Sequence, residues 1–245
     1  TFGSVTPGHP EYGHTKGVEV TTGPLGSGFA AAVGMAMAAR YEHGMLDPNT
    51  PLGESPFDHV VYTVVGDGCL QEGVSSEAAS LAGTQNLGNL IAIYDDNRIS
   101  IEDDTSITFN EDVLARFEAC GWHTQKVDWR QADGSYREDV PSLAAALDAA
   151  LAEKTRPSLI ALSTIIGWPT PGKSDTGGIH GAKLGSPALE GLKTALGADP
   201  QLMFDVDEAL IDFTRAQVAE RVAVDIEAWD EALRVWSAKN RDKVH

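Results

Sequence analysis

The sequence has 245 residues, of which 42% are hydrophobic and 22% charged, a composition typical of a globular protein and not of a disordered chain. Its 36 acidic residues outnumber its 18 basic residues, so the formal net charge is −18, and the resulting field opposes binding to nucleic acid or anionic lipid. A membrane span needs about 18 apolar residues, and no run in this sequence approaches that length. We therefore expect no nucleic-acid partner and no membrane partner.

The cysteines and the first residues bear on the cellular compartment. Cys69 and Cys120 are too few and too isolated for a disulfide framework or a thiolate metal site, which favours a reducing environment. Residues 1–4 have neither the charged nor the apolar part of a secretory signal. We predict a cytoplasmic protein that holds any bound phosphate locally, through backbone N–H groups or a metal.

Along the chain, apolar strand patterns alternate with helical patterns. The strand runs are short and continuously apolar, as in strands that are buried on both faces of a parallel sheet. In order, we predict a helix over residues 29–43 closed by Gly44, a strand over 60–65, a helix near 75–85, a strand over 90–94, a helix from the N-cap Asn110 through Cys120, a strand over 122–127, a helix over 142–154 and a strand over 159–166. This order predicts an α/β fold with a doubly wound, mostly parallel sheet.

Two further segments follow this alternation. Residues 167–187 are rich in Gly, Pro, Ser and Thr, which predicts a long loop that crosses the carboxyl edge of the sheet and carries His180. Residues 205–243 return to helical spacing. In this tail the positions expected to be buried are Leu210, Phe213, Val218, Val222, Ile226, Trp229 and Leu233. We therefore predict an α/β domain over residues 1–200 and a helical extension over residues 201–245.

Polar residues follow two of the predicted strands. Asp67 lies between Gly66 and Gly68 directly after the strand at 60–65, and Asn97 follows the next strand about 30 residues later, the length of one βαβ crossover. A carboxylate, an amide oxygen and a nearby main-chain carbonyl are hard ligands that suit Mg²⁺ or Ca²⁺ and not Zn²⁺. The glycines would let backbone N–H groups approach a diphosphate at the start of a helix. Together these residues predict a metal-assisted diphosphate site.

Each of these motifs taken alone has a simpler interpretation. Residues 66–68 would be a tight turn and residues 95–97 a polar loop, and it is their joint occurrence that favours a site. Glu72 is best explained as an acid that stabilises the first turn of a helix, the alternative being a charge in a proton network. Residues 23–26 either lead into the following helix or place their backbone and the Leu25 side chain against a flat ligand ring.

Two histidines in loops are candidate proton-transfer groups. His9 lies in a loop whose backbone is restricted by Pro7 and Pro10, and His180 lies in the long loop after the last predicted strand. Taken alone, each histidine is better explained as a surface residue.

A series of motifs in a fixed order closely resembles the transketolase family. The motifs are Gly8-His9-Pro10-Glu11, Thr22-Gly23-Pro24-Leu25-Gly26, Gly66-Asp67-Gly68-Cys69 with Glu72-Gly73, Asp95-Asp96-Asn97 with Ile99-Ser100-Ile101, and His180-Gly181-Ala182 with Leu184-Gly185. Many thiamine diphosphate enzymes share the Gly-Asp-Gly to Asn signature, whereas the Gly-His-Pro-Glu and His-Gly-Ala blocks are those of transketolases. The similarity runs from the first residue to about Gly185 and is looser in the tail.

The resemblance implies the thiamine diphosphate-binding fold and, specifically, the domain that binds the diphosphate end of this cofactor. The residues that it assigns to a divalent cation (Mg²⁺, Ca²⁺ or Mn²⁺) are Asp67, Asn97 and, through its main-chain carbonyl, Ile99. Those that it assigns to the cofactor are Gly23, Pro24, Leu25, Gly68, Asn97 and His180, with Leu25 against the aminopyrimidine ring. It also implies proton-transfer roles for His9 and His180 and a carboxylate network between active sites for Glu72.

The reaction implied by the resemblance is the reversible transfer of a two-carbon ketol unit from a ketose phosphate to an aldose phosphate in the pentose phosphate pathway. The implied partners are sugar phosphates and the second subunit of a homodimer. Two residues depart from the family pattern, because Lys183 stands where proline is frequent and Ile179 where serine is frequent.

The resemblance also implies an incomplete site. In the family, further active-site histidines precede this stretch, and the glutamate that activates the aminopyrimidine lies in a pyrimidine-binding domain that follows it. We therefore expect an α/β domain that is N-terminally incomplete, with no turnover by this chain alone, whether it is part of a longer polypeptide or one subunit of a split enzyme. The alternatives are a non-catalytic cofactor-binding module or a related enzyme, dihydroxyacetone synthase or 1-deoxyxylulose-5-phosphate synthase.

Overall fold

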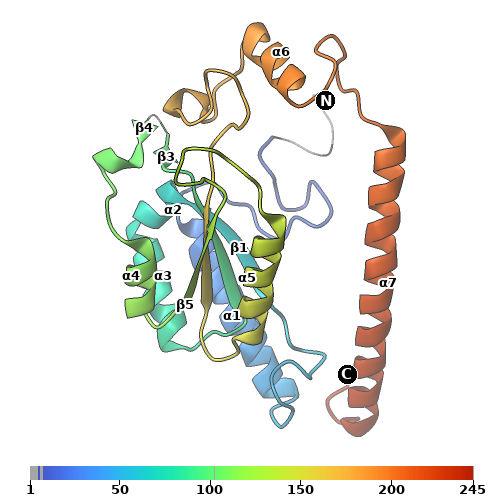
Figure 1. The fold of residues 1–245 in the computed structure, drawn as a ribbon. Coiled ribbons are helices and arrows are strands. Elements are labelled where there is room, and N and C mark those ends of the chain that lie inside the picture. Colours follow the sequence, from blue (N-terminus) through green and yellow to red (C-terminus); the bar gives the residue numbers. More distant parts are fainter. Residues whose placement is uncertain (1–4, 6–7, 102, 245) are drawn as a thin grey trace.

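The computed structural model describes residues 5, 8–101 and 103–244 (Figure 1). Residues 1–4, which show no secretory signal, and Pro7, which precedes His9, lie outside the described residues. The strands are β1 (Val61–Gly66), β2 (Leu90–Asp96), β3 (Ile99–Ser100), β4 (Asp103–Asp104), β5 (His123–Asp128) and β6 (Ser158–Ser163). The helices are α1 (Ser27–Leu46), α2 (Asp67–Gln71), α3 (Gly73–Thr84), α4 (Val113–Ala119), α5 (Val140–Ala152), α6 (Ser186–Ala195) and α7 (Glu208–Lys239), with the 3-10 turns η1 (Thr105–Ile107) and η2 (Gly177–Ile179).

Four parallel strands form the main sheet in the order β1-β2-β6-β5, which confirms the predicted α/β fold. Gly66 of β1 pairs with Asp95 of β2, and Asp96 of β2 pairs with Ser163 of β6. The carboxyl ends of these three strands therefore lie at one edge of the sheet. The short antiparallel pair of β3 and β4 follows β2 directly at this edge.

Helices cover both faces of the sheet, as in a doubly wound fold (Figure 1). On one face α1, α3 and α4 bury an aromatic cluster of Phe29, Phe117 and Trp122, whose ring centroids lie 5.0 to 6.1 Å apart. On the other face α5 packs over β5 and β6. Side chains alternate along β2, so Tyr94 faces the first layer and Ile91 the second.

Two predicted helix ends and one loop differ from the structure. Helix α1 continues through Gly44, where a helical glycine makes no left-handed turn that would end the helix. Asp112, and not Asn110, caps α4, because the Asp112 carboxylate accepts a hydrogen bond from the Ala115 N–H at 3.0 Å. Helix α6 lies after the long loop and was not among the predicted elements.

Strand β1 is an edge strand, and the prediction that residues 60–65 are buried on both faces is wrong. Val65 is buried, whereas Tyr62 is 53% exposed and Val64 is 70% exposed. The physical reason is position, since β1 is at the edge of the sheet away from β5, and α5 makes its main strand contacts with β5 and β6. The continuous apolar run of β1 is therefore covered on only one face of the sheet.

The predicted C-terminal helix is present as α7, but the predicted burial of its apolar residues is wrong. Of the seven positions, six are exposed and Leu233 is half-buried. Helix α7 runs alongside the α/β body in Figure 1 and contacts it near its C-terminal end. There the Trp229 indole N–H donates to the Pro56 carbonyl at 2.9 Å, and Trp236 packs edge-to-face on Phe57 with a centroid distance of 4.7 Å. These side chains stay exposed because helical spacing predicts the helix but does not predict that another element packs along it.

Replacing Trp236 by alanine should release α7 from the body. Loss of a buried aromatic side chain costs about 3–5 kcal/mol, and here the cost falls on docking of the helix. Amide hydrogens of α7 should exchange faster in deuterium-exchange mass spectrometry, while those of β2 keep their protection. Trp229→Phe removes one hydrogen bond, worth about 1 kcal/mol, and should change exchange less. Equal exchange of α7 in the wild type and in Trp236→Ala would contradict this view of its anchoring.

None of the helices in the described part of the chain is both long enough and apolar enough to cross a membrane.

Candidate functional site

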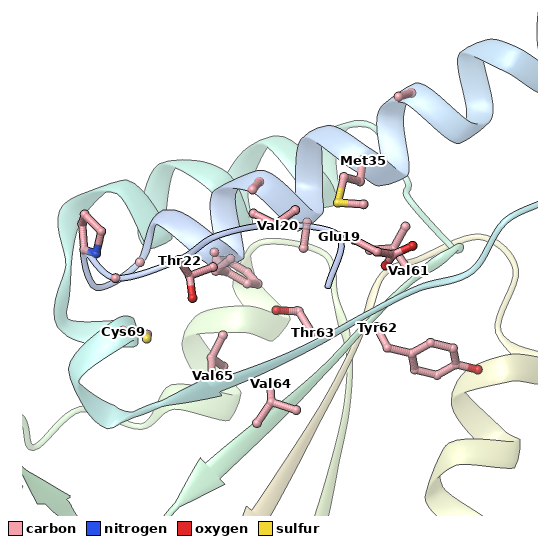
Figure 2. Close-up of a pocket in the computed structure, with 18 of the residues that line it drawn as sticks. Glu19, Val20, Thr22, Met35, Val61, Tyr62, Thr63, Val64, Val65 and Cys69 are labelled. Carbon is pink, nitrogen blue, oxygen red and sulfur yellow. The ribbon is translucent and has the colours of Figure 1, made fainter. Parts of the chain in front are cut away.

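A cleft of about 1020 Å³ lies between the segment that leads into α1, helix α1 itself and strand β1 (Figure 2). In Figure 2, Val20 and Thr22 come from the leading segment, Met35 from α1, and Thr63 and Val65 from β1. The candidate site residues that belong to the lining are His9, Gly23, Pro24 and Leu25. Four residues predicted to face a cofactor or substrate thus share one cleft.

Two glycines bring candidate residues into contact. A Cβ placed on Gly23 would lie 3.6 Å from Nε2 of His9, so the backbone of Gly23 runs beside the imidazole ring. A Cβ placed on Gly68 would lie 3.1 Å from Cδ1 of Leu25 and 3.4 Å from Oγ of Ser100. Gly68 therefore joins the Leu25 wall of the cleft to the segment after β2, and a Cβ at this position would press on the end of the Leu25 side chain.

Gly26 places the start of α1 against the start of α3. Its φ is +78°, and a Cβ at this position would lie 2.8 Å from Cγ1 of Val74 and 3.0 Å from Cβ of Glu72. Only glycine adopts this backbone conformation at so close an approach without strain. Glu72 is the N-cap residue of α3 and makes no capping hydrogen bond, so its exposed carboxylate is not engaged by its own helix.

Asp67 is the first residue of α2 and is buried directly after β1, with 3% of its surface exposed. Its Oδ1 accepts a hydrogen bond of 2.7 Å from the Tyr94 hydroxyl, and its Oδ2 has no hydrogen-bond partner among the described residues. Burial, reinforced by the negative charge of Asp96, raises the pKa of Asp67 from 3.8 to about 6, against the lowering effect of the Tyr94 hydrogen bond. Burial and the Asp67 carboxylate likewise raise the pKa of Tyr94, so its hydroxyl keeps its proton at neutral pH.

The free oxygen of Asp67 fits a bound cation. A buried carboxylate oxygen without a partner costs free energy, and a divalent cation at that oxygen would remove the cost. Asp67 also lines a cavity of about 330 Å³ together with Tyr94 and Asp96. Within residues 8–101 and 103–244, no three His, Cys, Asp or Glu side chains gather as a metal cluster. The predicted set of one carboxylate, one amide oxygen and one main-chain carbonyl is of a different kind, suited to Mg²⁺.

Asn97 lies at the same edge of the sheet as Asp67, because Gly66 and Asp95 are paired neighbours in β1 and β2. Its Nδ2 donates to Oδ2 of Asp95 at 3.0 Å, and its Oδ1 accepts from the main-chain N–H of Ile99 at 2.9 Å. Ile99 begins β3 and is itself buried. The structure thus brings the three predicted metal ligands to one strand edge, and Ser100 connects this edge to Gly68.

His180 lies apart from the cleft. It follows η2 in the loop after β6, is exposed, and among the described residues does not belong to the cleft lining. Arg130 holds this loop through two hydrogen bonds of 2.6 and 2.8 Å to the Asp175 carboxylate, which raise the pKa of Arg130. The loop returns toward the carboxyl edge of the sheet, since η2 lies beside β4. The structure therefore places η2, which His180 directly follows, beside β4.

Sequence reasoning missed the residues that hold the predicted ligands. Tyr94 contacts Asp67 across 27 positions of sequence, and Thr164 contacts Asp95 from the end of β6. Tyr94 and Thr164 both carry a hydroxyl group at the end of a buried strand, next to the predicted metal site. That position was a signal in the sequence that could have identified them.

One family model matches residues 1–245, and its description is transketolase, thiamine diphosphate binding domain. The chain belongs to the transketolase family. A transketolase from Mycobacterium leprae (strain TN) is 52% identical over 235 residues, which cover 94% of this chain and 33% of that relative. The chain therefore spans about a third of the length of such transketolases.

Solved transketolase structures have the same fold. A transketolase from Pichia stipitis in complex with sedoheptulose 7-phosphate has a TM-score of 0.85 and 41% identity, and the match covers 98% of this chain and 34% of that chain. The transketolase from Leishmania mexicana gives a TM-score of 0.85 at 41% identity, covering 97% of this chain and 34% of that one. The predicted family is thus confirmed, and thiamine diphosphate is the cofactor that names this domain.

Proposed function

We propose that this chain supplies the diphosphate and metal half of a transketolase active site, which transfers a two-carbon ketol unit reversibly from a ketose phosphate to an aldose phosphate in the pentose phosphate pathway. The observation that carries the proposal is the buried Asp67 carboxylate, whose Oδ2 has no partner among the described residues, next to a cleft lined by family motifs. A cation and a diphosphate would satisfy that oxygen and occupy the adjoining glycine-lined space.

In this proposal the side chains of Asp67 and Asn97 and the main-chain carbonyl of Ile99 would bind a divalent cation. The cation would be Mg²⁺ or alternatively Ca²⁺ or Mn²⁺. When bound, thiamine diphosphate supplies the electron sink for carbanion chemistry. The residues that would bind it are Gly23, Pro24, Leu25, Gly68, Asn97 and His180. The contact of Gly68 with Leu25 supports a continuous wall for this ligand.

The chain's own residues would orient the reactants and move protons. His9 would exchange a proton at Nε2, the atom beside Gly23 in the cleft, and His180 would approach the donor sugar from its loop. Glu72 would contribute its unengaged carboxylate to a proton network between active sites. These three are the proposed catalytic residues.

The proposed partners follow from the share of its relatives that the chain spans. Residues 1–200 would form the cofactor domain, and residues 201–245 would lead to a pyrimidine-binding domain in the complete protein or on a second chain, in a cytoplasmic homodimer. Helix α7, with its exposed apolar side chains, supports a connecting role. Structures of the Pichia stipitis enzyme are complexes with sedoheptulose 7-phosphate, xylulose 5-phosphate and fructose 6-phosphate, and we propose sugar phosphates of this kind as substrates.

Titration calorimetry with thiamine diphosphate tests the binding half of the proposal. We expect heat of binding in the presence of Mg²⁺ and none in the presence of a chelator. Heat that is independent of metal, or no heat in either condition, would contradict it.

Product analysis tests the catalytic half. With xylulose 5-phosphate and ribose 5-phosphate, the chain alone should form no product. Together with a pyrimidine-binding domain it should form a seven-carbon ketose phosphate and a three-carbon aldose phosphate. Turnover by the chain alone would refute the proposal that the chain holds only half of the active site. Other products would favour a related thiamine diphosphate enzyme.

A further inference from the structure

Two successive residues of β2 each hold one of the proposed metal ligands. The Tyr94 hydroxyl donates to Oδ1 of Asp67 at 2.7 Å, and Oδ2 of Asp95 accepts from Nδ2 of Asn97 at 3.0 Å. Successive side chains leave a strand on opposite sides, so one short stretch of β2 reaches a ligand that follows β1 and a ligand that follows β2 itself. Neither Tyr94 nor Asp95 is itself among the proposed ligands of the cation or the cofactor.

Tyr94 fixes the orientation of the Asp67 carboxylate. Tyr94 is 4% exposed, and its ring is packed in the same core as Phe117, so the hydroxyl has a fixed position. Its single proton is donated to Oδ1, which leaves Oδ2 as the oxygen that lacks a partner among the described residues. Rotation of the carboxylate plane away from this orientation would break the bond in a site with little solvent to replace it.

Asp95 selects between the two orientations of the Asn97 amide. An ionised carboxylate only accepts hydrogen bonds, so the amide NH₂ of Asn97 must face Asp95. The main-chain N–H of Ile99 only donates, so the amide oxygen must face Ile99, and the distance is 2.9 Å. Both contacts select the same orientation. Thr164, after β6, donates to Oδ1 of Asp95 and fixes the carboxylate from the neighbouring strand.

We propose that Tyr94 and Asp95 are positioning residues for the divalent cation: Tyr94 fixes the orientation of the Asp67 carboxylate, and Asp95 determines which side of the Asn97 amide is presented to the cation. The inference rests on the proposed function and deepens it, because it assigns part of the metal affinity to residues that orient the ligands and do not themselves bind the metal. Groups that hydrogen-bond to metal ligands fix the orientation of those ligands, and their loss typically weakens metal binding about 10-fold to 100-fold.

Binding of Mn²⁺ to the 245-residue chain in the presence of thiamine diphosphate tests this without any turnover. The electron paramagnetic resonance signal of free aqueous Mn²⁺ gives the dissociation constant directly. Tyr94→Phe and Asp95→Ala should each raise that constant about 10-fold to 100-fold, because each frees one ligand to rotate. Asp95→Asn keeps an oxygen that can accept from Nδ2 of Asn97, so this variant should bind Mn²⁺ close to the wild-type value.

Two controls separate positioning from folding. Tyr41→Phe removes a hydroxyl from a side chain on α1 that is 70% exposed and should leave Mn²⁺ binding unchanged. Thr164→Val removes the contact behind Asp95 at nearly constant shape, and should weaken Mn²⁺ binding less than Asp95→Ala does. All Mn²⁺ dissociation constants are measured well below the midpoint temperature of thermal unfolding of each metal-free variant. A loss of stability is then not mistaken for a loss of affinity.

The outcomes distinguish this inference from the proposed function on which it rests. Wild-type Mn²⁺ affinity in both Tyr94→Phe and Asp95→Ala would overturn the inference and leave the metal site in place. Equal losses in Asp95→Asn and Asp95→Ala would also overturn it for Asp95, since the retained acceptor would then be irrelevant. Absence of Mn²⁺ binding by the wild-type chain would overturn the proposed function itself, and the inference with it.

Discussion

Replacement of Asp67 by asparagine should abolish metal-dependent binding of thiamine diphosphate and, at the same time, stabilise the metal-free protein. The affinity loss should exceed 100-fold, the upper end of about 10-fold to 100-fold seen for groups that only support a ligand, because here a charged ligand is removed. The shape of the side chain and the hydrogen bond from Tyr94 are retained, since the asparagine oxygen can still accept from the hydroxyl. Calorimetry with and without Mg²⁺ measures the affinity.

The gain in stability follows from the raised pKa of Asp67. A carboxyl group whose pKa rises from 3.8 to about 6 on folding destabilises the folded state wherever it is ionised. About two pKa units correspond to about 3 kcal/mol, a penalty that is absent below pH 4, grows between pH 4 and pH 6 and is complete above pH 6. Asparagine is neutral at all of these pH values, so it lacks this pH-dependent penalty. The difference in unfolding free energy between Asp67→Asn and the wild type should therefore be largest near pH 7 and shrink toward pH 5.

Thermal unfolding of the metal-free proteins between pH 5 and pH 7.5 measures this difference. Asp148→Asn, a change of the same type at an exposed position on α5, should alter neither cofactor binding nor the pH dependence. A metal-free Asp67→Asn protein that unfolds at a lower temperature than the wild type at pH 7 would show that the carboxylate serves the fold, and would argue against a ligand role.

Substitution of Gly83 by alanine should be strongly destabilising. A Cβ at Gly83 would lie 1.7 Å from the carbonyl oxygen of Cys120 and 2.8 Å from its carbonyl carbon. These are backbone atoms of the turn between α4 and β5, so no side chain can move aside and the whole helix α3 must shift. Overpacking of this severity costs about 3 kcal/mol or more. Because the N-terminal end of α3 packs on Gly26, the shift would also reach the cleft.

Gly44→Ala is the matched control for this substitution. Gly44 also lies inside a helix, α1, and has nothing within 4 Å of its would-be Cβ. Alanine should stabilise the protein there by about 0.5–1 kcal/mol through its higher helix propensity. Urea unfolding of both variants gives the two free energies with the same method. Changes of the same sign and size would mean that the close approach of α3 to Cys120 does not constrain the fold.

The sequence predicted those features that depend on local pattern. Continuous apolar runs located β2 and β6, and leucines at helical spacing located α5, because periodicity reports which residues share a face. Burial was predicted poorly wherever it depends on what lies opposite. Tyr62 of β1 and Phe213 of α7 fit the apolar spacing of their segments but remain exposed, since no pattern within a segment reports what covers it.

For the site, the rule that ligands lie at the carboxyl ends of parallel strands placed Asp67 and Asn97 at one edge, and the register of β1 and β2 agrees with it. The hydroxyl groups at the strand ends are visible in the sequence, but the side chains that they contact could not be derived from it. Tyr94 reaches Asp67 only after β1 and β2 have paired, and Arg130 reaches Asp175 across 45 positions. Such pairings follow from the packed topology and not from local composition.

Under the proposed function, binding of the cation and thiamine diphosphate at Asp67 would make the stability of this chain depend on thiamine supply. A ligand that binds only the folded form stabilises it by about 2.7 kcal/mol at a concentration 100 times its dissociation constant. When thiamine is scarce, that increment disappears and the buried charge remains, so a larger fraction of molecules unfolds at any moment and is exposed to proteases. Cellular abundance should thus fall with starvation for thiamine even at constant synthesis, and Asp67→Asn should remove that dependence.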